Sequence, residues 1–355
     1  MRCLLALLLV LGMNMKSPAA VFVYVSKAPE EEIQIYKLNP ADGSLSEVET
    51  VKVGGQPGAI GFDPTHKFMY ASIRSTNSIA AYQVDAATGK VKLLNTVPLT
   101  FGQNAAFVGT DRTGKWLISA SYLGAQTVVH KLNADGTIDP TAVDTQETAK
   151  TAHSFGQDRE NKFVFVPHVA PNAVYQFRFD AATGKLTPAG QAVGGKDDAG
   201  PRHIALHPTL DFMYTSDESG RSITAYRLDP ATGLTPVQTL STVPPEYEDK
   251  GGSTAEVKIH PSGKFVWISN RGHDSLAGFT IAADGKLTAN GHAPTEEKPR
   301  SFEIDPSGKY VFGAGEASGK LAVFRCDEST GKLERIRTYP IGKSLTWVKA
   351  VELGK

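Results

Sequence analysis

The chain has 355 residues, of which 41% are hydrophobic and 21% are charged. This length leaves room for a large core and the charged fraction excludes a bundle of membrane helices, so we expect a soluble globular protein. Basic and acidic residues both number 37, and this balance gives no indication of binding to nucleic acid or to an anionic membrane.

Residues 1–20 predict a secretory signal peptide. Arg2 precedes an apolar run from Leu4 to Leu11, and small residues near Ala19 and Ala20 are typical of a cleavage site. The run is too short to span a bilayer, which disfavours a permanent anchor. We therefore expect a periplasmic or secreted protein that has no membrane contact after cleavage.

From residue 21 onwards the sequence repeats with a spacing of 46 to 52 residues. The marker is a turn in which Gly follows Thr or Asp, and Gly suits such a turn because it adopts a positive φ between two strands. The seven glycines are Gly43, Gly89, Gly136, Gly184, Gly233, Gly285 and Gly331. Repetition on this scale indicates an architecture built from similar units.

A second turn lies between successive glycines, at an Asp or His that is usually followed by Pro. Asp bonds its own backbone and Pro fixes φ, so each site predicts a hairpin turn. The turn residues are Asp63, Asp111, Asp158, His207, His260 and Asp305. The strands that follow carry Phe68, Trp116, Phe163, Phe212, Phe265 and Tyr310, which we expect to pack between units.

Two turns and about four short strands per unit predict an all-β, seven-bladed β-propeller rather than a helical solenoid. There are seven glycine turns but only six turns of the second kind. Val21 to Val25 corresponds to a second strand, and Ser344 to Leu353 corresponds to a first strand. We therefore expect residues 21–355 to form a single propeller domain whose last blade joins both chain ends.

The longest interruption of the repeat is rich in Pro and Gly and spans residues 242–253. It predicts a loop before an inner strand. Two interpretations remain open, a tolerated insertion and a flap over the channel mouth.

The stretch around the His207 turn holds the first candidate site residues. Arg202 precedes one strand of this hairpin and Glu218 follows the other, symmetrically about position 210. An antiparallel hairpin places such residues side by side at its open end.

Aligning the blades on their turns gathers more charged residues at the same end of the channel. The candidates are His153, Arg202, Glu218, Arg271, Arg300 and Glu316, with Arg74 and Tyr122 at equivalent positions. Arginine binds carboxylate, phosphate or an oxyanion, histidine can activate water, and a glutamate with a raised pKa can protonate a leaving oxygen. The alternative is that these charges pair with one another and close the pore.

Other candidates are weaker. We expect His207 and His260 to bond their own turns, and Cys326 to be packed after an apolar strand. We take the remaining histidines, which lack metal-ligand spacing, as solvated: His66, His130, His273 and His292. The sequence has no paired-cysteine motif, nucleophile elbow or phosphate loop, so no metal or cofactor is predicted.

Several motifs resemble the seven-bladed propeller lactonases, which include bacterial 6-phosphogluconolactonase and fungal 3-carboxy-cis,cis-muconate lactonizing enzyme. They are Thr151-Ala-His153-Ser, Gly200-Pro-Arg202-His203, Ser216-Asp-Glu218 and Ser269-Asn-Arg271. The resemblance covers about Val21 to Leu353. It implies lactone-ring hydrolysis without a required metal or cofactor, with His153, Arg202, Glu218 and Arg271 as catalytic residues.

We therefore expect a lactonase acting on a small, anionic sugar-type or carboxylated lactone. His153 is the expected base and Glu218 the expected acid, although these roles can be exchanged. The expected substrate-binding residues are Arg300, Glu316, Arg74, Tyr122 and His203. Two alternatives remain, a non-catalytic propeller that binds a ligand or protein, and a lactonizing enzyme that works in the opposite direction.

Overall fold

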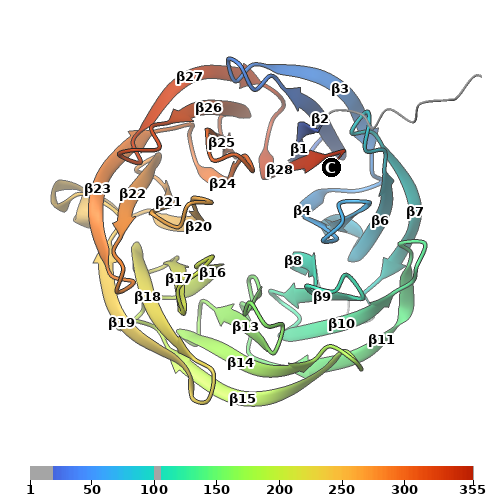
Figure 1. The fold of residues 1–355 in the computed structure, drawn as a ribbon, viewed down its shortest axis with the longest axis horizontal. Helices are drawn as coiled ribbons and strands as arrows, with labels where there is room; N and C mark the ends of the chain where they lie inside the picture. Colours follow the sequence, from blue (N-terminus) through green and yellow to red (C-terminus); the bar gives the residue numbers. More distant parts are fainter. Residues whose placement is uncertain (1–18, 100–104, 355) are drawn as a thin grey trace, which may run out of the picture.

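The computed structural model describes residues 19–99 and 105–354, and the predicted signal peptide lies almost wholly outside them. Within the described residues, four-stranded antiparallel sheets form seven blades arranged in a ring (Figure 1). Two short 3-10 helices, η1 (Arg74–Thr76) and η2 (Pro245–Lys250), are the only helices of the described part. The prediction of an all-β, seven-bladed propeller is confirmed.

The blades are numbered here from the first complete one. Blade 1 contains β4 (Pro57–Phe62), β5 (Phe68–Ile73), β6 (Ser78–Val84) and β7 (Val91–Pro98). Blade 2 contains β8 (Ala105–Thr110), β9 (Trp116–Ser121), β10 (Gln126–Leu132) and β11 (Ile138–Glu147). Blade 3 contains β12 (Gly156–Gln157), β13 (Phe163–His168), β14 (Ala173–Asp180) and β15 (Lys185–Val193).

The other blades follow in chain order. Blade 4 contains β16 (Pro201–Leu206), β17 (Phe212–Asp217), β18 (Ser222–Asp229) and β19 (Gly233–Ser241). Blade 5 contains β20 (Ser253–Ile259), β21 (Phe265–Arg271), β22 (Ser275–Ile281) and β23 (Leu287–Pro294). Blade 6 contains β24 (Pro299–Ile304), β25 (Tyr310–Gly315), β26 (Lys320–Cys326) and β27 (Leu333–Pro340). The closing blade contains β28 (Leu345–Leu353), β1 (Ala20–Lys27), β2 (Glu32–Leu38) and β3 (Leu45–Lys52).

The closing blade joins the two ends of the chain, as predicted. Its strand order is β28-β1-β2-β3, so the C-terminal strand lies innermost (Figure 1). The antiparallel register of β1 and β28 runs from Ala20, opposite Leu353, to Lys27, opposite Leu345. This pairing covers an edge that each strand would otherwise expose.

The hairpin turns form by the predicted mechanism. Asp111 Oδ1 accepts a hydrogen bond of 3.0 Å from the backbone N–H of Trp116, and Asp305 Oδ1 accepts one of 2.6 Å from Tyr310. Nδ1 of His207 accepts from the N–H groups of Thr209 and Leu210, which confirms its role in the turn.

The aromatic residues pack between blades as expected, and their partners are the turn glycines of the next blade. Gly136 has φ of +84°, and a Cβ at this position would overlap the ring of Phe68. Gly285 has φ of +77° and meets Phe212 in the same way. Each of these glycines therefore permits both a turn and the close approach of two blades.

The innermost strands carry a recurring irregularity that the sequence analysis missed. In blade 4, Pro201 pairs with Asp217 and His203 pairs with Ser216, so Arg202 occupies a β-bulge. The symmetric register expected about residue 210 is therefore wrong, although Arg202 and Glu218 remain neighbours. Equivalent register shifts interrupt the inner strands of blades 1, 2, 5 and 6. A bulge directs an additional side chain out of the strand, here at one end of the channel.

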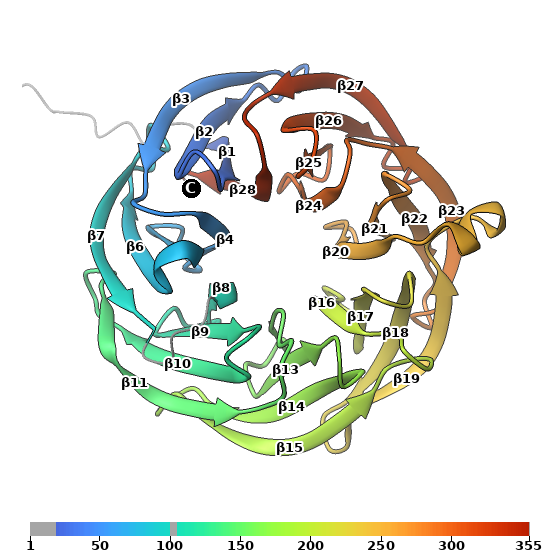
Figure 2. The ribbon, with the colours of Figure 1, turned by 180° about the vertical axis from the view of Figure 1, so that it is seen from behind.

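The 242–253 insertion contains η2 and lies at the periphery of the ring. Figure 2 shows this golden segment beyond β22 and β23 rather than across the channel. Tyr247 packs against the ring of His273, with 4.7 Å between ring centroids. This position favours the tolerated insertion over the flap.

Cys326 is buried, as expected for a packed thiol. Burial raises the pKa of the thiol to about 11. Within residues 19–99 and 105–354, no helix has the length and hydrophobicity needed to span a bilayer.

Candidate active site at one mouth of the channel

The predicted site residues come from two recurring places in the blades. His153, Arg202 and Arg300 lie at or just before the start of an innermost strand, near the inner-strand bulges. Arg74, Tyr122, Glu218, Arg271 and Glu316 lie at the end of a second strand or directly after it. Because first and second strands are antiparallel, both places lie at the same end of a blade.

Glu218 joins two arginines from neighbouring blades. Its Oε1 lies 2.9 Å from Nη2 of Arg271, and its Oε2 lies 3.0 Å from Nε of Arg202. Both contacts are ion pairs, and Nε of Arg202 and Oε2 of Glu218 lack a hydrogen-bond partner. Backbone carbonyls fix the guanidinium groups further: Arg202 donates to Ala255 O at 2.7 Å, and Arg271 donates to Thr254 O at 2.8 Å.

Electrostatics keep this group ionised. Burial raises the pKa of Glu218, but Arg202 and Arg271 outweigh it and hold the pKa below its usual range. Burial, together with Arg300 and Arg271, lowers the pKa of Arg202 to about 9. Glu218 is thus a carboxylate at neutral pH, and this direction argues against the acid role expected for it.

His153 is buried beside this group. Burial and then the positive charge of Arg202 hold its pKa well below the usual value, so the imidazole is neutral near pH 7. Its Nδ1 lies 3.2 Å from Nε2 of His203, and its ring contacts the ring of Tyr122 at 5.4 Å between centroids. Among the described residues none forms a hydrogen bond with Nε2 of His153. A neutral imidazole of this kind is able to accept a proton from water.

A second group of charges lies on the other side of the mouth. Arg300 Nη1 lies 3.5 Å from Oε1 of Glu316, and Lys298 Nζ lies 3.9 Å from Oε2. Arg74 and Glu316 line a cavity of about 460 Å³, together with Gln56 and Thr346. This volume is in the range of small-molecule sites.

The mouth carries more positive than negative charge. The four arginines Arg74, Arg202, Arg271 and Arg300 outnumber the two glutamates, Glu218 and Glu316, and Lys298 adds a further positive charge. Arg202, Arg271 and Arg300 pair with the two glutamates, as the pore-closing interpretation expects, and the set still carries net positive charge. The excess favours an anionic ligand.

The arrangement differs from the expected one at His203. This side chain is only 1% exposed, and its two ring nitrogens face Glu256 and His153. Phe107 and Trp347 contact its ring at 5.8 and 5.6 Å between centroids. Phe107 and Trp347 also contact each other, at 5.5 Å between ring centroids.

Sequence reasoning missed Glu256, which bonds His203. Its Oε1 lies 2.7 Å from Nδ1 of His203. Both residues stand four positions before the turn residue of their blade, His207 or His260. The alignment examined only the fifth position, where blade 5 has Ala255, so this signal was available one residue further on.

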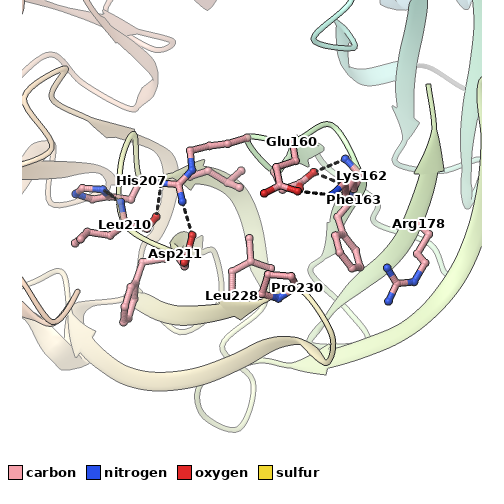
Figure 3. A pocket seen from close by; sticks show the side chains of 13 residues that line it. Glu160, Lys162, Phe163, Arg178, His207, Leu210, Asp211, Leu228 and Pro230 are labelled. Carbon is pink, nitrogen blue, oxygen red and sulfur yellow. Dashed lines mark hydrogen bonds and ion pairs between the residues drawn. The ribbon is translucent and has the colours of Figure 1, made fainter. Parts of the chain in front are cut away.

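A separate pocket of about 180 Å³ lies between blades 3 and 4, away from the predicted residues (Figure 3). Its charged side chains are paired, with Arg159 against Asp211 and Lys162 against Glu160. The guanidinium of Arg178 lies 4.7 Å from the ring centre of Phe163. No residue predicted for the site lines this pocket. Across the described ranges, no cluster of three or more His, Cys, Asp or Glu side chains is arranged to hold a metal ion.

Comparison with known proteins agrees with the fold and with the motifs. The family model "Lactonase, 7-bladed beta-propeller" matches residues 19–350. A 6-phosphogluconolactonase of Pectobacterium carotovorum is 33% identical over 337 residues, covering 93% of this chain and 98% of the relative. One of Serratia proteamaculans is 32% identical over 330 residues, with 92% and 97% covered.

Solved structures give the same comparison. A putative 6-phosphogluconolactonase of Bacteroides uniformis superposes with a TM-score of 0.85 at 25% identity, covering 94% of this chain and 99% of that one. A periplasmic gluconolactonase of Pseudomonas aeruginosa superposes with a TM-score of 0.84 at 20% identity, with 94% and 99% covered. At 20% identity the likeness establishes the fold alone.

Proposed function

The chain belongs to the seven-bladed β-propeller lactonase family, and we propose that it hydrolyses an anionic sugar lactone of the 6-phosphogluconolactone type at the mouth described above. The observation that carries the proposal is the buried, neutral His153 beside a set of arginines with excess positive charge. The names of the relatives, 6-phosphogluconolactonase, support this class of substrate.

The proposed reaction is the addition of water to the lactone carbonyl. His153 Nε2 accepts a proton from the attacking water, and the water oxygen forms a bond to the carbonyl carbon. The negative charge that develops on the carbonyl oxygen is stabilised by the positive field of Arg202 and Arg271. When the carbon–oxygen bond of the ring breaks, the imidazolium returns the proton to the leaving ring oxygen. The products are the hydroxy acid and unchanged enzyme.

Glu218 has a different role in this scheme from the acid first expected. As a carboxylate between Arg202 and Arg271, it holds both guanidinium groups in place. His153 then serves as base and acid in turn. Arg300 and Arg74 lie where the substrate's own anionic group would bind, beside the cavity of about 460 Å³.

The experiment is a lactone panel followed by release of acid. We expect the protein to hydrolyse 6-phosphogluconolactone above the spontaneous rate, and His153→Ala to lower kcat by about 10²- to 10⁴-fold, the usual loss for a general base. His292→Ala is the matched control, because this exposed histidine lies on the outer strand β23 and should leave the rate unchanged.

Two outcomes contradict the proposal. Rates equal to the spontaneous reaction on 6-phosphogluconolactone, gluconolactone and carboxymuconolactone alike, with a tight partner captured instead, would support a non-catalytic binding propeller. Full activity of His153→Ala would show that another group activates water.

We also propose export, from residues 1–20. The signal-peptide pattern supports it, and so does the periplasmic location in the name of the Pseudomonas aeruginosa relative. N-terminal sequencing of the native protein should begin near Val21, and the protein should fractionate with the periplasm or medium. A native chain that begins at Met1 contradicts export without affecting the catalytic proposal.

A further inference from the structure

A buried chain of three titratable side chains leads away from the mouth into the channel wall. We infer that Glu256 and His203 are positioning residues that hold His153 in the tautomer whose Nε2 carries a free lone pair. This inference rests on the proposed role of His153 as the base. Neither positioning residue is placed to touch the substrate.

The geometry is continuous across three blades. Glu256 Oε1 on β20 lies 2.7 Å from His203 Nδ1 on β16, and His203 Nε2 lies 3.2 Å from His153 Nδ1. The exposed fractions are 2% for Glu256, 1% for His203 and 5% for His153. These contacts thus connect the inner parts of blades 5, 4 and 3.

The chemistry of the donors and acceptors fixes the direction of both hydrogen bonds. A carboxylate only accepts, so His203 must donate from Nδ1–H to Glu256. Neutral His203 then has its lone pair on Nε2 and accepts from Nδ1–H of His153. With its proton on Nδ1, neutral His153 keeps the lone pair on Nε2, which is the atom able to deprotonate water.

Glu256 is ionised, as this direction requires. Burial raises its pKa, but the hydrogen bond from His203 and the positive charges of Lys258 and Arg202 outweigh burial and lower the pKa to about 2. Burial lowers the pKa of His203 to about 4, so this ring is neutral near pH 7. The two values agree on a carboxylate bonded to a neutral imidazole.

The hydrogen-bonded side chains of Glu256, His203 and His153 are also shielded from solvent, which would compete for their hydrogen bonds. Phe107 and Trp347 pack against His203, as described above, and Phe155 lies 5.4 Å from Phe107 between ring centroids. The charged or titratable groups near the chain come from several elements. They are Arg202 and Lys258 for His203, and Arg202, Arg300 and Tyr122 for His153.

The arrangement also stabilises the protonated base. When Nε2 of His153 takes a proton from water, its Nδ1–H still donates to His203. The carboxylate of Glu256, on the far side of His203, then attracts the positive charge on His153. This attraction opposes the repulsion from Arg202 that disfavours the imidazolium.

The first test reads the tautomers without any substrate. In protein labelled with ¹⁵N at histidine, long-range ¹⁵N–¹H correlation spectra near pH 7 should show His153 and His203 protonated at Nδ1. Assignment uses His153→Asn and His203→Gln. A proton on Nε2 of His153 in the wild type overturns the inference.

The second test removes the carboxylate charge. Glu256→Gln should lower kcat at least tenfold with less than a twofold change in KM, and His153 should no longer show a single tautomer. Glu303→Gln is the matched control, because Glu303 is 6% exposed in the wall of the same channel and pairs with Lys349 and Lys258 instead of a histidine. Equal losses of kcat in both variants, with the His153 tautomer unchanged, would show that Glu256 acts only as a structural charge.

The third test compares two variants at His203, one that can keep its hydrogen bonds and one that cannot. His203→Gln can donate an amide N–H to Glu256 and offer its carbonyl oxygen to His153, whereas His203→Leu can do neither. We expect His203→Gln to retain the Nδ1–H tautomer of His153 and at least ten times the kcat of His203→Leu. Equal rates in the two variants contradict a positioning role.

These results separate this inference from the proposed function. If wild type hydrolyses no lactone, the tautomer spectra still decide how Glu256 and His203 hold His153. If wild type is active but His153→Ala is too, the base is wrong while the hydrogen-bonded chain stands.

Discussion

Arg202 keeps its positive charge although only 1% of the residue is exposed. The carboxylate of Glu218 and the carbonyl of Ala255 compensate for the water that the guanidinium has lost. Removing one partner of such a buried pair commonly costs about 3–5 kcal/mol, because the other charge is left uncompensated. A substitution of Glu218 therefore affects stability as well as activity, and its kinetics need a stability measurement beside them.

Asp217, the neighbour of Glu218, gives a prediction for stability against pH. Burial raises the pKa of this carboxyl to about 6, although hydroxyl groups of Thr215, Thr224 and Ser222 donate to it. The folded state then binds the proton more tightly than the unfolded state, whose pKa is near 3.8. The stabilising contribution is present at about pH 4 and is lost as pH rises to about 6.

We expect Asp217→Asn to remove this part of the pH dependence. The difference in free energy of unfolding between variant and wild type should shift in favour of the variant by about 3 kcal/mol from pH 4 to pH 7. Urea unfolding at both pH values measures the difference. A constant difference at the two pH values contradicts the raised pKa.

Arg300 gives a prediction for substrate choice. Its positive charge acts on both His153 and Arg74, and its Nη1 lies 3.5 Å from Oε1 of Glu316. Arg300→Gln should raise KM for 6-phosphogluconolactone about tenfold or more, the loss of one charge-assisted contact, and change KM for gluconolactone much less. Lys298→Gln serves as control, since Lys298 is exposed and meets the same glutamate at 3.9 Å. Equal changes in KM for both lactones would place the anionic group elsewhere.

The sequence identified most of the charged residues at the channel mouth but not their protonation states. Alignment of the turns placed Arg202 and Glu218 together, and the structure has them 3.0 Å apart. The lowered pKa of Glu218 depends partly on Arg271 in the next blade. The distance between Glu218 and Arg271 cannot be read from the sequence pattern of a single blade. Glu256 was missed although the sequence carries a signal for it, because Glu256 stands at the fourth position before its turn residue and the arginines stand at the fifth.

Single elements show how the sheet supplies the site. Each bulge adds one residue to an inner strand relative to its partner strand, and in blades 4 and 6 the residue without a register partner is an arginine, Arg202 or Arg300. Hydrophobic alternation and turn residues predict the strands, but the bulge is a change of register that leaves no turn signal. The insertion at residues 242–253 is similar: its composition predicts a loop, while its position at the periphery depends on packing against His273.

The contact between turn glycine and aromatic ring gives a prediction for stability. Gly136→Ala places a Cβ against Phe68 at a φ of +84°, so positive φ and overpacking should together lower the free energy of unfolding by about 2–5 kcal/mol. Gly190→Ala is the control: its φ is +101° and no atom lies within 4 Å of the new Cβ, so we expect only about 1–2 kcal/mol. Denaturant unfolding compares the two variants. Equal losses would show that contact between blades contributes nothing.

For the whole molecule, the number of blades and their closure followed from the sequence. Each blade carries its own turn residues, and seven glycine turns against six turns of the other kind indicated that one blade is shared between the chain ends. The contact between Phe107 and Trp347 did not follow, since it joins the first strands β8 and β28, which are far apart in the chain.

Closure of the ring by β28 gives a prediction for the stability of the whole molecule. A chain ending at Pro340 lacks β28, exposes an edge of β1 and leaves the core around Val23 and Val348 incomplete. We expect it to lose cooperative unfolding or to aggregate, as seen by circular dichroism and size-exclusion chromatography. A chain ending at Leu353 keeps all of β28 and should behave as wild type. A shortened chain ending at Pro340 that unfolds at the wild-type temperature would show that closure adds no stability.

The pairing of β1 with β28 also determines when the protein can fold. A ribosome completes β1 first, yet its inner partner begins only at Leu345, so the ring has to wait for nearly the whole chain. The ring of blades therefore stays open until the last residues of the chain have been synthesised. For a protein exported as proposed, the delay keeps the chain unclosed while it crosses the membrane, and the last strand to arrive completes the ring on the other side.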